Sequence, residues 1–230
     1  KLHGVRIWSG VVSSINLQQN SLKRLSGSES GLLTYYPMNE GKGTVVMDKA
    51  RGINAKLEGS WSMPAGRAIS LNGNAYVKAN TSFAPILKDM DYTMELWFKG
   101  EPGQSNATLL SSGKGNGSDL DGSEDLFTLG FEAGKLVFNN NSMAIPVEGN
   151  YLDNNWHHLA LAVNRNAGNG QVVIDGVLKR TFDPQGLGGI ASAQVLMGAR
   201  GWYSDPVTLQ VDQHFKGYID EVRLWNTYLS

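Results

Sequence analysis

The feature that most constrains the fold of this chain is a set of turn dipeptides placed between runs of apolar residues. Asn72-Gly73 and Asp175-Gly176 each separate two such runs, and Ala133-Gly134 divides a third. Asn-Gly and Asp-Gly readily adopt the positive φ angles that a type I′ turn requires. Three signals of this kind predict a mainly antiparallel β protein whose strands are joined by hairpins.

The segments between these turns have the patterns of strands. Along 92–98, Met94, Leu96 and Phe98 alternate with residues of a second face, and 157–163 is apolar on both faces after its histidines. A strand that is apolar on both faces is typical of the middle of a sheet that is covered on both sides. The 28 glycines punctuate many short strands. This pattern predicts an all-β sandwich.

One segment departs from the strand pattern. Residues 13–25 carry apolar side chains at roughly helical spacing, with Ser13 or Ser14 able to cap the start and Gly27 able to end it. We therefore expect one short N-terminal helix.

An internal repeat suggests how the chain is organised. Residues 4–13 match residues 221–230, with Val, Arg, Trp and Ser coinciding, at a separation of about one domain. The simplest interpretation is a tandem array. Residues 1–30 would be the last strand of a preceding repeat plus a helical connector, and 31–230 would be one complete β-sandwich domain. The start at Lys1, without a signal-peptide pattern, also suggests a fragment or a processed product.

Composition excludes several classes of protein. The absence of cysteine excludes disulfides and thiolate metal sites. A net charge of −1 argues against a general affinity for nucleic acid. No apolar run approaches the roughly 18 residues of a transmembrane helix, so we expect no membrane insertion.

Six motifs in order resemble the laminin-G-like domains of the concanavalin A-like lectin/glucanase superfamily. They occupy 31–43, 67–77, 92–98, 155–160, 173–177 and 215–225. The resemblance implies a jelly-roll sandwich of two curved antiparallel sheets whose first and last strands lie close together. Members of this superfamily include glycoside hydrolases, lectins, protein-binding modules and spacers, so the fold alone does not decide the function.

The sequence argues against catalysis. In the catalytic relatives the carboxylates follow a Glu-x-Asp-x-x-Glu pattern along one strand, and this chain has no such run. It also lacks the Gly-x-Ser-x-Gly elbow of serine hydrolases. His157 and His158 are adjacent on a strand and must point to opposite faces, so they cannot chelate one ion together. We expect no enzymatic activity.

Asp220 is the carboxylate that most suggests a metal. On an ideal strand it shares a face with Val222 and Leu224, where a carboxylate is costly to bury unless it is paired or binds a cation. Several relatives carry a structural calcium near the meeting of the first and last strands, and the resemblance implies Asn39 and Asp48 as companion ligands. The alternative is that Asp220 accepts hydrogen bonds from backbone amides of a neighbouring loop or from an arginine.

Two loops are candidates for ligand binding. Asp119 and Asp121 lie in an acidic glycine-flanked segment that is either a cation loop or a solvated loop. Trp202, Tyr203 and Asp205 lie in a connection that runs longer than is usual in the family. Aromatic side chains beside charged ones can stack on a sugar or anchor a protein interface, or they can simply cover the end of the sandwich.

These observations together predict a non-catalytic glycan- or protein-binding module. We expect it in an adhesin-like tandem-repeat protein, extracellular or on the cell surface, beside neighbouring domains of the same chain. The first alternative is a structural spacer with a calcium ion as its cofactor. A weaker one is a glycoside hydrolase-related domain.

Overall fold

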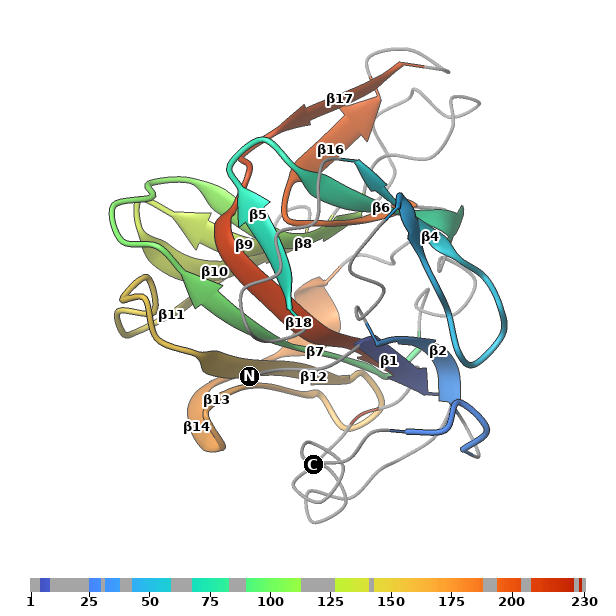
Figure 1. The fold of residues 1–230 in the computed structure, drawn as a ribbon. Coiled ribbons are helices and arrows are strands. Elements are labelled where there is room, and N and C mark those ends of the chain that lie inside the picture. Colours follow the sequence, from blue (N-terminus) through green and yellow to red (C-terminus); the bar gives the residue numbers. More distant parts are fainter. Residues whose placement is uncertain are drawn as a thin grey trace.

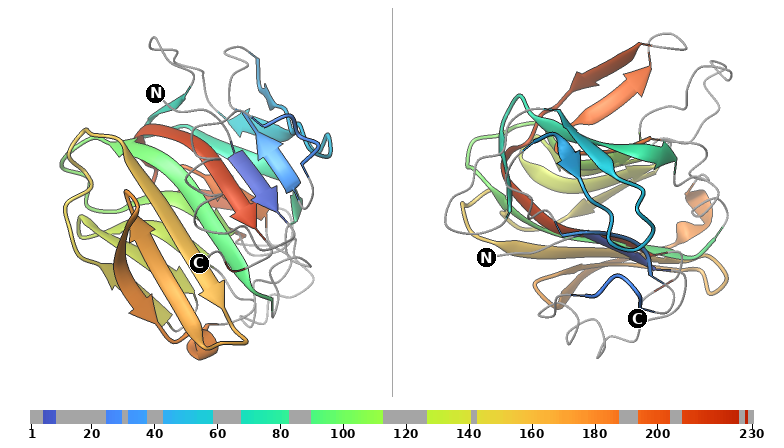
Figure 2. Two further views of the ribbon diagram at one scale, coloured as in Figure 1. Left: turned by 90° about the horizontal axis from the view of Figure 1, so that it is seen from below. Right: turned by 45° about the vertical axis from the view of Figure 1, so that its right-hand side comes forward.

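The computed structural model shows an all-β sandwich (Figure 1). The structure describes residues 5–8, 25–29, 32–37, 43–58, 68–82, 90–112, 127–140, 143–187, 194–203, 208–225 and 228. Within these residues, two eight-stranded sheets form separate layers, and a hairpin forms a third sheet of two strands (Figure 2). The described part contains no α-helix, and hence no helix that could cross a membrane.

Sheet A is formed by eight strands from all parts of the chain. These are β1 (Val5–Trp8), β2 (Leu32–Tyr36), β5 (Ile69–Asn72), β7 (Tyr92–Gly100), β12 (His157–Asn164), β13 (Asn169–Ile174), β14 (Val177–Phe182) and β18 (Lys216–Trp225). Their spatial order is β14, β13, β12, β7, β18, β1 and β2, with β5 paired to β18. The last strand of the chain therefore lies inside the sheet, between β7 and the N-terminal strands.

Sheet B packs against it and is also eight-stranded. Its strands are β3 (Val45–Val46), β4 (Ala55–Glu58), β6 (Tyr76–Ser82), β8 (Ala107–Ser112), β9 (Phe127–Glu132), β10 (Lys135–Asn140), β11 (Met143–Val147) and β15 (Gln194–Met197). Their order is β11, β10, β9, β8, β15, β6, β4 and β3. A single turn of 3-10 helix, Pro184–Gly186, follows β14. The two-sheet antiparallel sandwich predicted from the sequence is confirmed.

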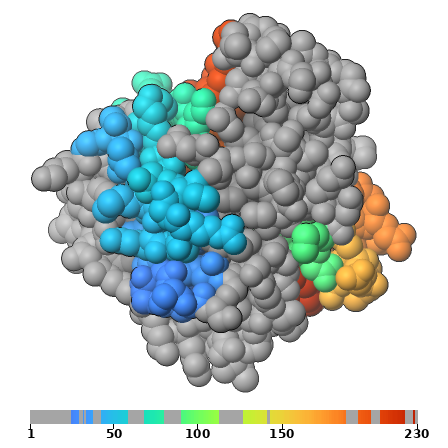
Figure 3. Space-filling model, turned by 90° about the vertical axis from the view of Figure 1, so that its right-hand side faces the viewer, coloured from blue at the N-terminus to red at the C-terminus, as the bar shows by residue number. Residues whose placement is uncertain are grey.

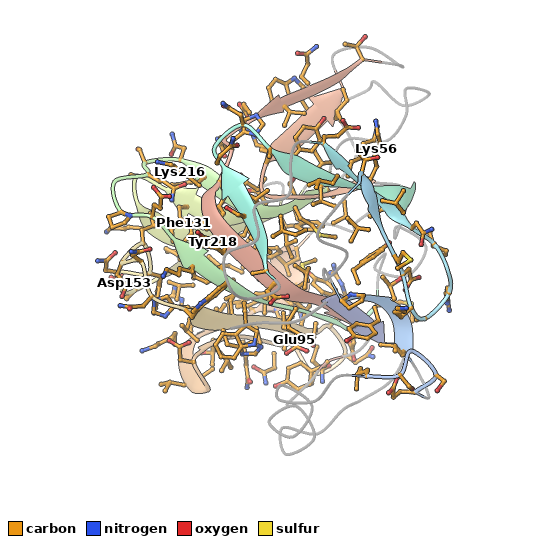
Figure 4. All side chains as sticks on the ribbon, viewed as in Figure 1. Lys56, Glu95, Phe131, Asp153, Lys216 and Tyr218 are labelled. Atoms are coloured by element: carbon orange, nitrogen blue, oxygen red, sulfur yellow. The ribbon has the colours of Figure 1, made fainter. Side chains whose placement is uncertain are left out.

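Aromatic side chains from both sheets fill the space between them. Phe98 of sheet A lies 5.8 Å, centroid to centroid, from Phe131 of sheet B in an edge-to-face arrangement, and 6.5 Å from Phe215. All three are at most 1% exposed, and Figure 4 shows Phe131 inside the sandwich. The period-2 alternation of the strands thus places one face of each sheet in a common core.

Two of the three predicted hairpins form, and the third does not. Asp175-Gly176 (φ 53° and 77°) joins β13 to β14, and Ala133-Gly134 (φ 47° and 76°) joins β9 to β10. Asn72-Gly73 does make a turn, with Gly73 at φ 87°. However, β5 pairs in sheet A and β6 in sheet B, so the hairpin prediction was wrong here. The turn carries the chain across the core because both flanking strands direct apolar residues into it.

A bulge in β18 overturns the predicted face of Asp220. Glu221 adopts φ 50°, and the register with β7 shifts between Asp220 and Arg223. Val222 lies in the core with Ile219, whereas Asp220 pairs with Trp97. The extra residue of a bulge changes which side chains face inward. Asp220 and Val222 therefore do not share a face.

The N-terminal residues are only partly described. β1 lies in sheet A, parallel to β18 and antiparallel to β2. The helix predicted over 13–25 lies outside the described residues except for Leu25, which is not helical. The division of the chain at residue 30 stays a prediction.

The core packing predicts that Phe98→Ala lowers the free energy of unfolding by about 3–5 kcal/mol, because it removes a buried ring and leaves a cavity. Urea denaturation followed by tryptophan fluorescence measures the change. Lys179→Ala, on the exposed strand β14, should stay within about 0.5 kcal/mol of the parent. Equal midpoints for the two variants would contradict this account of the core.

Candidate functional site

The most distinctive surface feature is a hairpin that stands on the outer side of sheet B. β16 (Arg200–Tyr203) and β17 (Leu209–Asp212) form a separate two-stranded sheet between β15 and β18. The two strands lie side by side (Figure 1). Their register pairs Arg200 with Asp212 and Trp202 with Gln210. Because alternate residues of a strand share a face, these four side chains lie on one side of the hairpin. We call them the hairpin platform.

The other side of the hairpin rests on sheet B. Leu196 of β15 is fully buried but points away from the core, since its neighbours Val195 and Met197 are the ones in the core cluster. A Cβ atom at Gly201 would lie 2.7 Å from Leu196 Cδ2 and 3.2 Å from Leu209 Cδ1. Glycine therefore lets the hairpin pack closely on Leu196, which leaves the platform facing outward.

A charged pair fixes the geometry of the platform. Arg200 donates from Nε to Asp212 Oδ1 at 2.8 Å and from Nη2 to Oδ2 at 2.6 Å. The guanidinium carbon lies 5.4 Å from the centre of the Trp202 ring, a cation–π arrangement. The hydrogen bond to Asp212 raises the pKa of Arg200. Both side chains are about two-fifths exposed, so the pair orients Trp202 more than it stabilises the fold.

Polar side chains of sheet B and of the segment after β17 surround the base of the hairpin. Thr108 donates its backbone N–H to the Gln213 carbonyl at 2.8 Å and its hydroxyl to Gln213 Oε1 at 3.2 Å. Asn139 donates its amide to Glu132 Oε1 at 2.6 Å, and the Glu132 charge acts on Arg200. The region therefore offers an aromatic ring together with several hydrogen-bonding groups.

The structure describes two of the five residues that were predicted to bind a ligand. Trp202 lies on the platform, and Tyr203 belongs to β16. Asp205, Asp119 and Asp121 lie outside the described residues, so their roles stay predictions.

Three platform residues were missed by the sequence analysis: Arg200, Gln210 and Asp212. A partial signal exists in the sequence, because Gln210 and Asp212 alternate with apolar residues after Pro206 in the long connection. Their register across the hairpin, however, cannot be derived from spacing alone.

Asp48, one of the predicted calcium ligands, is a buried acceptor of backbone amides. Its Oδ1 accepts from Tyr35 and Ala50 at 2.8 and 2.9 Å, and its Oδ2 accepts from Arg51 and Ile53 at 3.2 and 3.3 Å. These four bonds occupy all the lone pairs of the carboxylate. The loop lies on the face shown in Figure 3, where residues 43–58 adjoin the described residues before Pro37. A cation could bind Asp48 only by displacing these amides.

The other two predicted calcium ligands are Asp220 and Asn39. Asp220 is buried, and its Oδ1 accepts the Glu221 amide at 2.8 Å. Asn39 lies outside the described residues. Within the described ranges, no group of three or more His, Asp or Glu side chains is arranged to hold a metal ion. Calcium binding stays a prediction.

The two adjacent histidines point to opposite faces, as predicted. His158 Nε2 lies 3.1 Å from Glu95 Oε2 on the outer face of sheet A. His157 packs toward the core and has Asp175 Oδ2 2.8 Å from Nδ1 and Asp153 Oδ1 3.1 Å from Nε2. His157 thus ties the loop before β12 to the β13–β14 turn at one end of the sandwich, where Figure 4 labels Asp153.

The pKa of Asp153 is strongly lowered in the folded protein. The hydrogen bond from the Asn155 side chain is the main reason that its pKa is lowered to about 2, with smaller contributions from the Asn155 amide and His157. A carboxyl group of the unfolded chain titrates near pH 3.9. Because the folded pKa is the lower one, Asp153 stabilises the fold above about pH 4, and this contribution is lost as the pH falls toward 2.

Asp153→Asn should therefore flatten the dependence of stability on pH in that window. Urea midpoints of parent and variant, measured at steps between pH 5 and pH 2.5, should differ most at pH 5 and converge as the pH falls. A constant difference across the range would show that Asp153 does not titrate as described.

Several solved structures share this architecture. A search of curated proteins gave no match. Among solved structures, domain 4 of AbnA, a GH43 extracellular arabinanase from Geobacillus stearothermophilus in complex with arabinotriose, matches with TM-score 0.57 and 20% identity over 80% of this chain and 87% of that one. The CBM40 of the Ruminococcus gnavus IT-sialidase matches with TM-score 0.53 and 17% identity over 71% and 91%.

A third solved structure, the botulinum neurotoxin serotype D binding domain, matches with TM-score 0.57 and 15% identity over 83% of this chain and 47% of that one. At these identities the likeness concerns the fold alone. The family model described as the Concanavalin A-like lectin/glucanases superfamily matches residues 71–230, which include most of the sandwich and the whole hairpin. This chain therefore belongs to the Concanavalin A-like lectin/glucanases superfamily.

Proposed function

We propose that this chain is a non-catalytic glycan-binding module whose ligand contacts the hairpin platform. The observation that carries the proposal is the position of Trp202, whose ring is held by Arg200, which is itself fixed by two bonds to Asp212. A ring held in place before the ligand arrives loses little conformational entropy on binding.

The chemistry of the platform suits a sugar. The C–H groups of a sugar ring can pack on the free part of the indole, while its hydroxyl groups exchange hydrogen bonds with amide and carboxylate groups at the rim. Gln210, opposite Trp202 in the hairpin register, supplies both a donor and an acceptor. The platform thus combines an apolar surface and polar groups within a few residues.

The charge balance favours a neutral glycan. Arg200 is already paired with Asp212, and the negative charge of Glu132 also acts on it. An anionic sugar would have to compete with both carboxylates for the guanidinium. A neutral oligosaccharide can use the same groups as hydrogen-bond partners without this competition.

The comparisons support the binding role. Two of the matching structures are a domain of an arabinanase solved with arabinotriose and a sialidase CBM40, which has also been solved with sialyllactose. The absence of catalysis is supported by the lack of a Glu-x-Asp-x-x-Glu run in the sequence. We further propose that the module acts outside the cell, within an adhesin-like array of similar units.

Trp202→Ala should weaken binding to a neutral oligosaccharide such as arabinotriose by about tenfold or more, because a central aromatic contact is lost. Isothermal titration of the full chain measures the affinity, and circular dichroism checks that the fold is retained. The matched control is Lys179→Ala on β14, remote from the hairpin, which should bind like the parent. Parent-like affinity of folded Trp202→Ala would refute the site, and no binding of any oligosaccharide by the parent would refute the function.

Asp212→Asn tests the charge argument separately. Removing one carboxylate frees Arg200 to pair with an anion and releases Trp202 from its fixed position. The ratio of affinity for sialyllactose to affinity for arabinotriose should therefore rise. An unchanged ratio would mean that Arg200 and Asp212 do not determine the choice between neutral and anionic sugars.

A further inference from the structure

The two copies of the internal repeat lie side by side in sheet A. β1 has the sequence Val-Arg-Ile-Trp and the end of β18 has Val-Arg-Leu-Trp. The strands are parallel, with Ile7 opposite Leu224 and Trp8 opposite Trp225. This is also the register of the sequence alignment, so Ile7 and Trp8 each lie beside their counterparts in the other copy.

This pairing differs from the rest of the sandwich. Of all the strand pairs in the described part of the chain, the β1–β18 pair is the parallel one, and the others are antiparallel. β1 is inserted between β18 and β2, with its other edge antiparallel to β2 (Figure 2). It is therefore a short strand that fills a slot between the last strand of the chain and β2.

Main-chain hydrogen bonds along both edges of β1 hold it in this slot. An extended segment that adds to a sheet in this way is bound by its backbone, and its alternate side chains determine which sequence is accepted. The slot is filled here by the sequence of the sandwich's own last strand. A second copy of this unit carries the same sequence in its own β1, outside the β7–β18 pairing.

We propose that the space between β18 and β2 is an acceptor slot for a Val-Arg-(Ile/Leu)-Trp strand that a second copy of this unit can donate. In the present chain residues 5–8 occupy the slot. A second copy would fill it with its own β1, which lies outside the β7–β18 pairing, and would join two sandwiches through a shared sheet. This inference is independent of glycan binding, because the slot belongs to sheet A and the platform stands on sheet B.

The full chain with Ile7→Pro tests the slot. Proline removes a main-chain donor from β1, which is paired on both edges, and so weakens its hold. A synthetic peptide of residues 221–230 should then bind and raise the Tm of the variant by roughly 5 °C at saturating concentration. The parent should gain little, because its own β1 fills the slot.

Two controls make the result specific. A peptide of the same composition in scrambled order should not stabilise Ile7→Pro. Val177→Pro weakens β14, at the opposite edge of the same sheet, and should not respond to the 221–230 peptide. Equal stabilisation by the scrambled peptide, or of Val177→Pro, would overturn the proposal.

If Ile7→Pro does not fold on its own, a refolding experiment with the peptide tests the slot. Refolding from urea with the 221–230 peptide should then restore the far-ultraviolet circular dichroism of the parent, while the scrambled peptide should not. Failure of the 221–230 peptide to rescue refolding, or to shift the Tm of a folded variant, would show that the slot does not accept a donated strand. Neither result depends on glycan binding, which is measured with the parent.

Discussion

The contact between Phe98 and Phe131 is the constraint on which the rest of the molecule depends. β7 lies between β12 and β18, so its inner side chains are fixed laterally by two neighbours and meet sheet B across the gap. Burial of such rings away from water is the main favourable term in folding. Because this core requires only the inner face of each sheet, the outer faces and the edges are left for other uses.

The outer face of sheet B shows how such a use can arise without disturbing the core. Leu196 lies in the same strand as two core residues but points the opposite way, where it becomes the base on which the hairpin rests. Gly201 permits the close approach, and the alternation of β16 then sends Arg200 and Trp202 outward. The position of the platform thus follows from the same period of two that builds the core.

The fold could be predicted from the sequence where local patterns decide it. The alternation of apolar residues predicted which side chains of β7 face the core. The Asp-Gly dipeptide predicted the hairpin at Asp175-Gly176. The Asn72-Gly73 turn is equally local, but whether its strands pair with each other depends on the distant strands β18 and β15. The bulge at Glu221 has no sequence signal, since glutamate rarely adopts positive φ. In the candidate site, Trp202 could be predicted as an exposed aromatic, but its partners depend on a register that spacing does not fix.

The two surfaces inferred here can act at the same time because the core separates them. The acceptor slot lies within sheet A beside β18, and the platform stands on the outer face of sheet B. A strand donated to sheet A would make the main-chain bonds to β18 and β2 that β1 makes in the present chain. Joining units in this way would therefore leave every platform exposed, which is the arrangement that gains avidity for a repeated surface glycan.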